Sequence, residues 1–264
     1  MPDALFETIG DGRYHATELA RGPWDRDACH AGAPSALLAG LLDAAPSLAP
    51  MRIARLTFEI LRPVPLGEIA VHTEVVREGK RIALLEATIT TPDGTELVRC
   101  RAARIRTTEV AVPDEAGWDQ DAPRVDPDDL ERLRDPFVGF GAGFWDAVDV
   151  RPIMGAALGA PGPGSAWFRL TVPIAEGVTT TPTARVAAAG DYGNGIAPPL
   201  DIREHLFLNP DLTIHLHREP VGAWVALDSM SVVHGHGSGL TTSTLFDRDA
   251  RIGTALQSLF VAAR

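Results

Sequence analysis

The sequence contains two long segments of similar pattern, separated by a constant offset of 156 residues. ARLTFEILRPVPLGEIAVHTEVV (54–76) aligns without a gap with PDLTIHLHREPVGAWVALDSMSV (210–232). Over the 54 positions that begin at residues 54 and 210, nine residues are identical, and apolar positions such as Phe58 and Ile214 coincide. Repetition at a fixed spacing indicates that one structural unit occurs twice in a chain. We therefore expect both halves to contain the same series of elements.

Each copy is expected to begin with a helix and to continue with four strands. Residues 34–45 are the expected helix of the first copy, and residues 182–196 that of the second. The strands share period-two alternation and β-branched residues. In the first copy they are expected at 52–61, 68–79, 81–91 and 96–106, after a short run at 18–24 that matches another at 165–174. One helix against several antiparallel strands is an α+β arrangement, in which a curved sheet wraps the helix.

The composition is that of a soluble globular protein. The chain has 264 residues, of which 45% are hydrophobic and 22% charged. Its formal net charge of −11 argues against a nucleic-acid partner, which requires clustered Lys and Arg. No apolar run approaches the roughly 20 residues that span a bilayer, and the first residues do not resemble a signal peptide. With only two cysteines and no CxxC motif, we expect a cytoplasmic protein without a membrane partner.

A stretch rich in Asp and Pro separates the two copies. Residues 110–136 are predicted to be a linker between a first unit, residues 1–109, and a second unit, residues 137–264.

Three further stretches resemble one known family. GPWDRDACHAGAPSALLAGLLDAA (22–45) is similar to the first helix of the acyl-CoA thioesterase II-like family, which follows a His-x-Gly-x-Pro turn. GDYGNGI (190–196) is similar to the end of that family's second helix. LTTSTLFDRDARIGTALQSLFVAAR (240–264) is similar to its closing hairpin. The resemblance implies a double hotdog fold, in which a helix wrapped by an antiparallel sheet occurs twice, and it implies acyl-CoA thioesterase activity.

The resemblance also implies a mechanism and its residues. The family orients a water for attack on the thioester with an Asp, a Ser or Thr, and a Gln, and it uses no metal, cofactor or covalent intermediate. The matching positions are taken to be Asp211 at the start of a strand, Gln257 in the last strand, and Ser231, with Ser229 as the alternative hydroxyl. At the offset of 156 these three positions align with Arg55, Arg101 and Val75. We therefore expect the second copy to carry the reactive carboxylate. The first copy is expected to pair with the second and to form part of the wall of the site.

The acyl-CoA substrate suggests further contacts. His30, Gly32 and Gly193 are the expected substrate-binding residues, because glycine lets a backbone N–H approach the thioester closely. Arginine is the natural partner of the phosphates of coenzyme A, and candidates by charge are Arg62, Arg104 and Arg106. The acyl chain is expected in an apolar groove near Phe137, Phe140, Phe144 and Trp145.

Other functions remain open at the level of sequence. The hotdog scaffold also hosts hydratases and dehydratases, which need a paired histidine and carboxylate, and it can serve as a non-catalytic acyl-CoA binding protein. His215 and His217, and likewise His234 and His236, have a spacing that suits zinc, but no carboxylate or cysteine is spaced to complete a site. GHGSG lacks the spacing of a serine nucleophile elbow. Exposed sheet edges make a homo-oligomer a further expectation.

Overall fold

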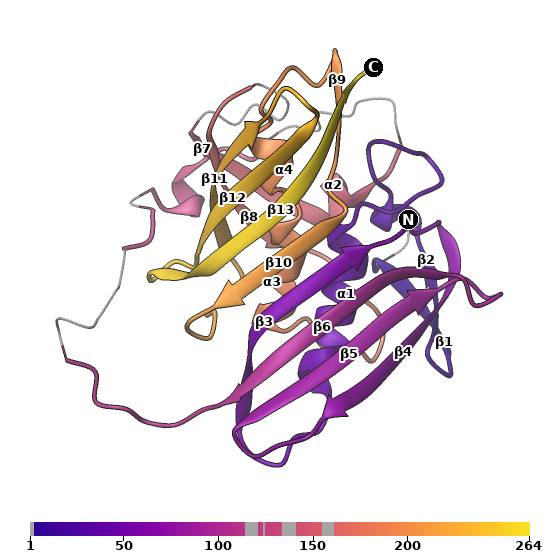
Figure 1. Ribbon diagram of the computed structural model, residues 1–264, viewed down its shortest axis with the longest axis vertical. Coiled ribbons are helices and arrows are strands. Elements are labelled where there is room, and N and C mark those ends of the chain that lie inside the picture. The colour runs from indigo at the N-terminus through magenta and orange to yellow at the C-terminus, as the bar shows by residue number, and fades with distance from the viewer. Residues whose placement is uncertain (1–2, 114–120, 124, 134–140, 155–160) are drawn as a thin grey trace.

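The computed structural model shows one continuous antiparallel sheet with the helices on one side of it (Figure 1). It describes residues 3–113, 121–123, 125–133, 141–154 and 161–264. The first half of the chain forms β1 (Phe6–Gly10), β2 (Arg13–Ala16), η1 (Glu18–Ala20), α1 (Gly32–Ala44), β3 (Met51–Ile60), β4 (Gly67–Arg77), β5 (Ile82–Thr90) and β6 (Glu96–Arg106).

The second half of the chain begins with η3 (Pro127–Asp129), α2 (Phe144–Ala147), β7 (Val148–Met154) and β8 (Gly164–Leu170). It continues with α3 (Pro182–Gly190), α4 (Gly193–Ile196), β9 (His205–Leu208), β10 (Asp211–Leu216), β11 (Val225–Val233), β12 (Ser238–Phe246) and β13 (Arg251–Ala263).

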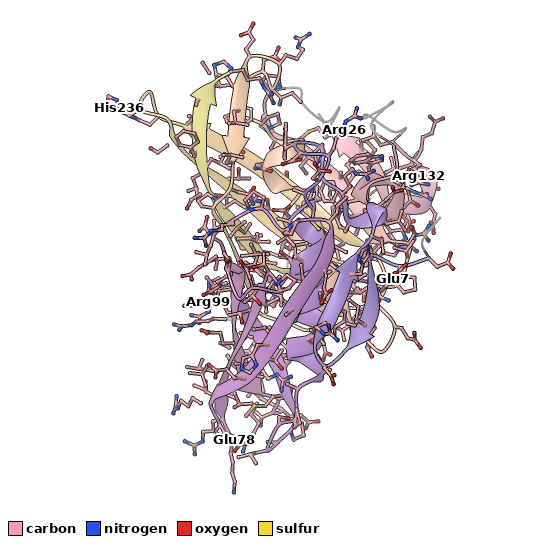
Figure 2. All side chains as sticks on the ribbon, turned by 90° about the vertical axis from the view of Figure 1, so that its right-hand side faces the viewer. Glu7, Arg26, Glu78, Arg99, Arg132 and His236 are labelled. Atoms are coloured by element: carbon pink, nitrogen blue, oxygen red, sulfur yellow. The ribbon has the colours of Figure 1, made fainter. Side chains whose placement is uncertain are left out.

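The strand order of the second half is the reverse of that of the first. Strands run β1-β2-β4-β5-β6-β3 and then β10-β13-β12-β11-β8-β7, with β9 pairing β13 off this path. The halves join where β3 pairs with β10, with Leu212 opposite Phe58. Figure 2 shows Glu78 and His236, from the β4–β5 and β11–β12 turns, at opposite ends of the molecule. The arrangement therefore has an approximate two-fold axis near the β3–β10 pair.

The last strand pair departs from the offset of 156. The turn between β12 and β13 spans residues 247–250, whereas that between β5 and β6 spans 91–95. One residue fewer in a turn moves every following side chain to the other face of a strand. Buried Gln257 therefore corresponds to buried Ala102, and the predicted alignment of Gln257 with exposed Arg101 is wrong.

Helices α1 and α3 pack antiparallel and very closely. A Cβ on Gly32 would lie 2.7 Å from the carbonyl oxygen of Ala188, and one on Gly40 would lie 3.2 Å from that of Thr179. The N-terminal end of α1 therefore meets the C-terminal end of α3. Alanine and glycine permit this approach, while the larger side chains of α1 (Leu37, Leu38 and Leu42, all fully buried) fill the core against the sheet.

The other end of α1 is closed by a buried arginine. Arg104 points inward from β6 with 3% of its surface exposed, and its guanidinium donates to the carbonyl oxygens of Leu42, Asp43, Ala45 and Pro46. Burial lowers the pKa of Arg104, although the nearby Asp43 opposes this. A cation suits a helix C-terminus, whose carbonyls lack intrahelical partners. Its donors are used within the protein, so Arg104, one of three candidates named by charge, is not available to a phosphate.

The short elements differ most from the sequence-based expectation. The short run expected at 18–24 begins with the 3-10 helix η1, because the Thr17 hydroxyl accepts a hydrogen bond from the Leu19 N–H and caps a turn there. The preceding strands β1 and β2, and β7 in the second half, were not expected.

Part of the expected linker packs against the second half. The Arg151 guanidinium donates to the carbonyl oxygens of Pro127 and Leu130. Phe137 and Phe140, expected near the acyl groove, lie outside the described residues. Within the described part of the chain, no helix has the length and hydropathy needed to cross a membrane.

Candidate active site

A cavity of about 850 Å³ lies beside the meeting ends of α1 and α3. Much of its wall is apolar, with contributions from Trp24, Leu133, Trp145, Val150, Phe207 and Phe260. Several of its polar groups gather around Asp191, which directly follows α3. An apolar cavity with a small set of convergent polar groups is typical of a small-molecule site.

The Asp191 carboxylate is buried, with 7% of the residue exposed, and is surrounded by donors. Asn209 Nδ2 donates to Oδ1 at 2.8 Å, and His30 Nδ1 lies 3.0 Å from Oδ2. The Gly32 N–H also donates to the carboxylate, and Gln257 Nε2 lies 3.4 Å from Oδ1. Burial alone would raise the pKa of Asp191, but the hydrogen bond and charge of His30, with the donors of Asn209 and Gly32, hold it below its usual value.

His30 reaches this carboxylate from the other half of the chain, just before α1. Its ring packs against those of Phe144 and Tyr192, with centroid distances of 4.8 Å and 4.7 Å, and these two rings stack on each other at 5.9 Å. The Gly32 nitrogen lies 3.0 Å from His30 Nδ1, which would suit an unprotonated Nδ1. An unprotonated Nδ1 would, however, set its lone pair against an ionised carboxylate 3.0 Å away. His30 Nδ1 therefore faces both the Gly32 N–H and the Asp191 carboxylate.

Gln257 holds the turn that carries Asp191. Its Oε1 accepts from the Asn194 N–H at 3.1 Å, and its Nε2 lies 3.4 Å from both the carbonyl oxygen and Oδ1 of Asp191. Gly193 makes this contact possible, since a Cβ there would lie 2.8 Å from Gln257 Oε1. Gln257 lies behind Asp191 and Asn194, which form the cavity wall.

The structure places Asp211 away from this cluster. Leu212 and Ile214 point into the core, so by alternation Asp211 lies on the outer face of β10. Its Oδ1 accepts from the Ser258 N–H at 2.7 Å, and it does not line the cavity. The structure therefore does not bring Asp211 and Gln257 together.

The two candidate hydroxyls lie further along the inner face of the sheet. Ser231 Oγ is 2.7 Å from Thr241 Oγ1, and Ser229 Oγ is 2.7 Å from Ser243 Oγ. Thr241 pairs with Gln257 across β12 and β13, so Ser231 is two strands away from Gln257. Neither Ser231 nor Ser229 lines the cavity.

Of the expected residues, the structure gathers Gln257, His30, Gly32 and Gly193 around Asp191. Sequence reasoning missed Asp191 and Asn209. The sequence contained a signal for each residue. Asp191 lies in GDYGNGI, the stretch that resembles the end of the family's second helix, and Asn209 lies two residues before Asp211. Over the described residues, no group of three His, Cys, Asp or Glu side chains is arranged to hold a metal ion.

Family models of acyl-CoA thioesterases match most of the chain. The acyl-CoA thioesterase N-terminal domain matches residues 20–105, and the acyl-CoA thioesterase C-terminal domain matches residues 119–261. A search of the curated proteins gave no match.

Solved structures share the fold over nearly their whole length. A putative thioesterase II from Thermobifida fusca has a TM-score of 0.74 at 18% identity, covering 98% of this chain and 96% of its own. A putative thioesterase from Novosphingobium aromaticivorans has a TM-score of 0.69 at 19% identity, covering 97% and 98%. A protein of unknown function with a hot dog fold from Alicyclobacillus acidocaldarius has a TM-score of 0.72 at 17% identity, covering 99% and 97%. With both domain models matched, the chain belongs to the acyl-CoA thioesterase family and is a thioester hydrolase.

Proposed function

We propose that this protein hydrolyses an acyl-CoA to the free acid and coenzyme A in the cavity beside Asp191. The observation that carries the proposal is a buried, ionised carboxylate in an apolar cavity, held by donors from both halves of the chain. We also infer that residues 1–109 and 137–264 are two hotdog modules joined by 110–136, because their strand orders mirror each other about the β3–β10 pair.

Direct attack by water is favoured over a covalent route. Cys29 lines the cavity, but burial raises its pKa to about 12, so its thiol stays protonated at neutral pH and is a poor nucleophile. No serine or threonine of the described chain lines the cavity. Asp191 takes the place that the sequence analysis gave to Asp211, and the amide of Asn209, rather than a hydroxyl, contacts it.

Coenzyme A carries phosphate groups, and two arginines that line the cavity can contact these phosphates. Arg62 is exposed in the segment after β3, and its Nη1 donates to the Glu96 carbonyl oxygen. The Arg132 side chain is 53% exposed and is labelled in Figure 2. We assign these two residues to the phosphates, because arginine pairs well with phosphate oxygens.

Thiol release from a panel of acyl-CoAs tests the proposal. Short, medium, long and aromatic acyl groups are each incubated with the protein, and free coenzyme A is measured with a thiol reagent. We expect release that saturates with substrate for at least one class. Thermal stabilisation by acyl-CoA without released thiol for any class would contradict hydrolysis, and it would identify a binding protein instead.

The His30–Asp191 pair favours hydration of an enoyl-CoA as a second candidate activity. A hydratase needs a paired acid and base, and the structure provides one in the cavity. The test is loss of the enoyl absorbance without thiol release. Since the chain is a thioester hydrolase by family, we expect thiol release to dominate.

Replacing Gly193 by alanine is expected to reduce kcat/KM by at least about tenfold, while costing about 1–3 kcal/mol of stability. The added Cβ would lie 2.7 Å from Ser243 Oγ and 2.8 Å from Gln257 Oε1, so Gln257 must move away from Asn194. Gly235→Ala is the matched control, because its Cβ meets nothing within 4 Å. Equal activity of the two variants would show that Gln257 is not needed in this position.

A further inference from the structure

We propose that the outer face of strands β10, β11, β12 and β13 is the interface through which two copies of this chain form a two-fold symmetric dimer. The outer face is the side of the sheet that is turned away from α1 and α3 (Figure 1). The proposal concerns assembly, so it goes beyond the proposed hydrolysis and does not depend on it.

Four large apolar side chains are neighbours on this face and are exposed to solvent. The exposed fraction is 55% for Met230, 54% for Val232, 42% for Leu240 and 37% for Leu256. Val232 pairs with Leu240 across β11 and β12, and Leu256 is a diagonal neighbour of Leu240, which pairs with Ser258 across β12 and β13. We call these four residues the apolar patch. Contiguous exposed apolar side chains mark an interaction site.

The first half of the chain has charged residues where the second half has the patch. One row of outward side chains crosses the whole sheet, and it consists in order of Glu74, Glu86, Arg101, Thr57, Thr213, Leu256, Thr242 and Met230. On the first side of the row, Glu86 forms an ion pair with Arg101. On the second side, Met230 takes the position of Glu74, and Leu256 that of Arg101. A solvated outer face can keep its charges, as the first half does, so their loss in the second half indicates a face that is covered.

The edges of the sheet are occupied by other segments of the same chain. At one edge, the Phe6 N–H of β1 donates to the Ile174 carbonyl oxygen at 2.8 Å. At the other edge, the Val150 carbonyl oxygen of β7 accepts the Leu133 N–H at 2.7 Å. The edge pairing that the sequence led us to expect is therefore blocked at these positions, and the outer face is the better surface for self-association.

The outer face is large enough for a stable dimer. Strands β11 and β12 each have nine residues. Four strands spaced about 4.8 Å apart, with a rise of about 3.3 Å per residue, cover roughly 20 Å by 30 Å, or about 600 Å² before the relief of the side chains is counted. Specific interfaces bury about 800 Å² on each partner. Two copies of this face, packed as two sheets against each other, therefore supply an interface of ordinary size.

The charges beside the patch suit a second copy of the same face. A parallel row of outward side chains begins with Asp228 on β11, continues through Thr244 and Thr254, and ends with His215 on β10 and Arg55 on β3. A two-fold axis that runs along the strands between β12 and β13 exchanges β11 with β10. It sets the acidic end of this row in one copy against the basic end in the other. Burial already raises the pKa of Asp228, and a cation from the second copy would offset that cost.

Sedimentation velocity of the full chain, over a wide range of concentration, tests the proposal with Met230→Glu and Leu256→Arg. Both substitutions use the residue types that the first half carries at the same places, Glu74 and Arg101, so the fold should tolerate them. We expect wild type to be a dimer. Each variant should raise the dissociation constant of the dimer at least about 100-fold, because an unpaired charge would be desolvated in the interface.

Glu74→Met is the mirror control, because it changes the same place in the first half and should leave the sedimentation of wild type unaltered. Thermal unfolding checks that each variant is folded. Met230, Leu256 and Glu74 do not line the cavity, so thiol release remains a separate measurement. Loss of the dimer with thiol release retained would therefore support the interface alone.

The orientation of the two copies is tested by exchanging the ends of the charged row. Asp228→His should weaken the dimer, and Asp228→His combined with His215→Asp should restore part of the loss. A double variant as weak as Asp228→His would contradict the proposed axis. If wild type sediments as a monomer at every concentration, the apolar patch serves a different partner and the proposal is wrong. It is equally wrong if Met230→Glu and Leu256→Arg both dimerise as wild type does.

Discussion

Asp191→Asn is expected to lower kcat/KM for acyl-CoA by about 10³–10⁴-fold. An amide that keeps its oxygen toward Asn209 would turn its NH₂ toward His30 Nδ1. The site would then lose the negative charge that could activate a water for attack on the thioester. The substitution preserves shape, so it removes the charge while leaving the cavity walls in place.

The measurement is initial-rate thiol release with the fold checked by thermal unfolding. Asp211→Asn is the informative comparison, because the sequence-based assignment expects the reverse pattern. Under our proposal Asp211→Asn keeps most of the wild-type rate, since its carboxylate lies on the outer face of β10 against the Ser258 N–H. A large loss of activity in Asp211→Asn, together with an active Asp191→Asn, would show that Asp211 on β10 is the reactive carboxylate.

Arg104→Met is expected to destabilise the folded protein by about 2–4 kcal/mol. The thioether fills the space of the arginine stem, but the carbonyls at the end of α1 lose the charged donors that satisfy them. Buried acceptors without partners cost about 1–3 kcal/mol each, partly offset because the guanidinium no longer has to be desolvated.

Urea unfolding measures this effect as a shift of the unfolding midpoint, provided that the slope of the unfolding free energy against urea concentration is unchanged. Arg106→Met is the control, because Arg106 is exposed near the end of the same strand and should change stability by no more than about 0.5 kcal/mol. A cost for Arg104→Met no larger than that of the control would show that water can replace the guanidinium at the helix end.

The regular elements of this fold could be predicted because each strand repeats its pattern every two residues. The predicted 96–106 coincides with β6, and the predicted 52–61 differs from β3 (Met51–Ile60) by one residue at each end. The inward position of Gln257 follows from the same alternation. Because Leu212 points into the core, the same alternation places Asp211 on the outer face of β10. The sequence pattern therefore argues against Asp211 as a catalytic residue.

The site could not be predicted in the same way, because it depends on packing between distant segments. His30 and Asp191 are 161 residues apart (191 − 30) and meet only because α1 and α3 run antiparallel at very short distance. Alternation and repeat spacing carry no information on that contact. The repeat even misleads at β13, where one residue fewer in the preceding turn shifts the register and changes which residue of the first half corresponds to Gln257.

The two ends of the α1–α3 pair have become chemically different. At one end an imidazole and a carboxylate border a cavity, and at the other the guanidinium of Arg104 is folded onto the helix terminus. A fused pair of like modules would otherwise offer two equivalent chambers. Each polypeptide should accordingly turn over a single substrate at a time, and a tight-binding substrate mimic should titrate with a stoichiometry of one per chain.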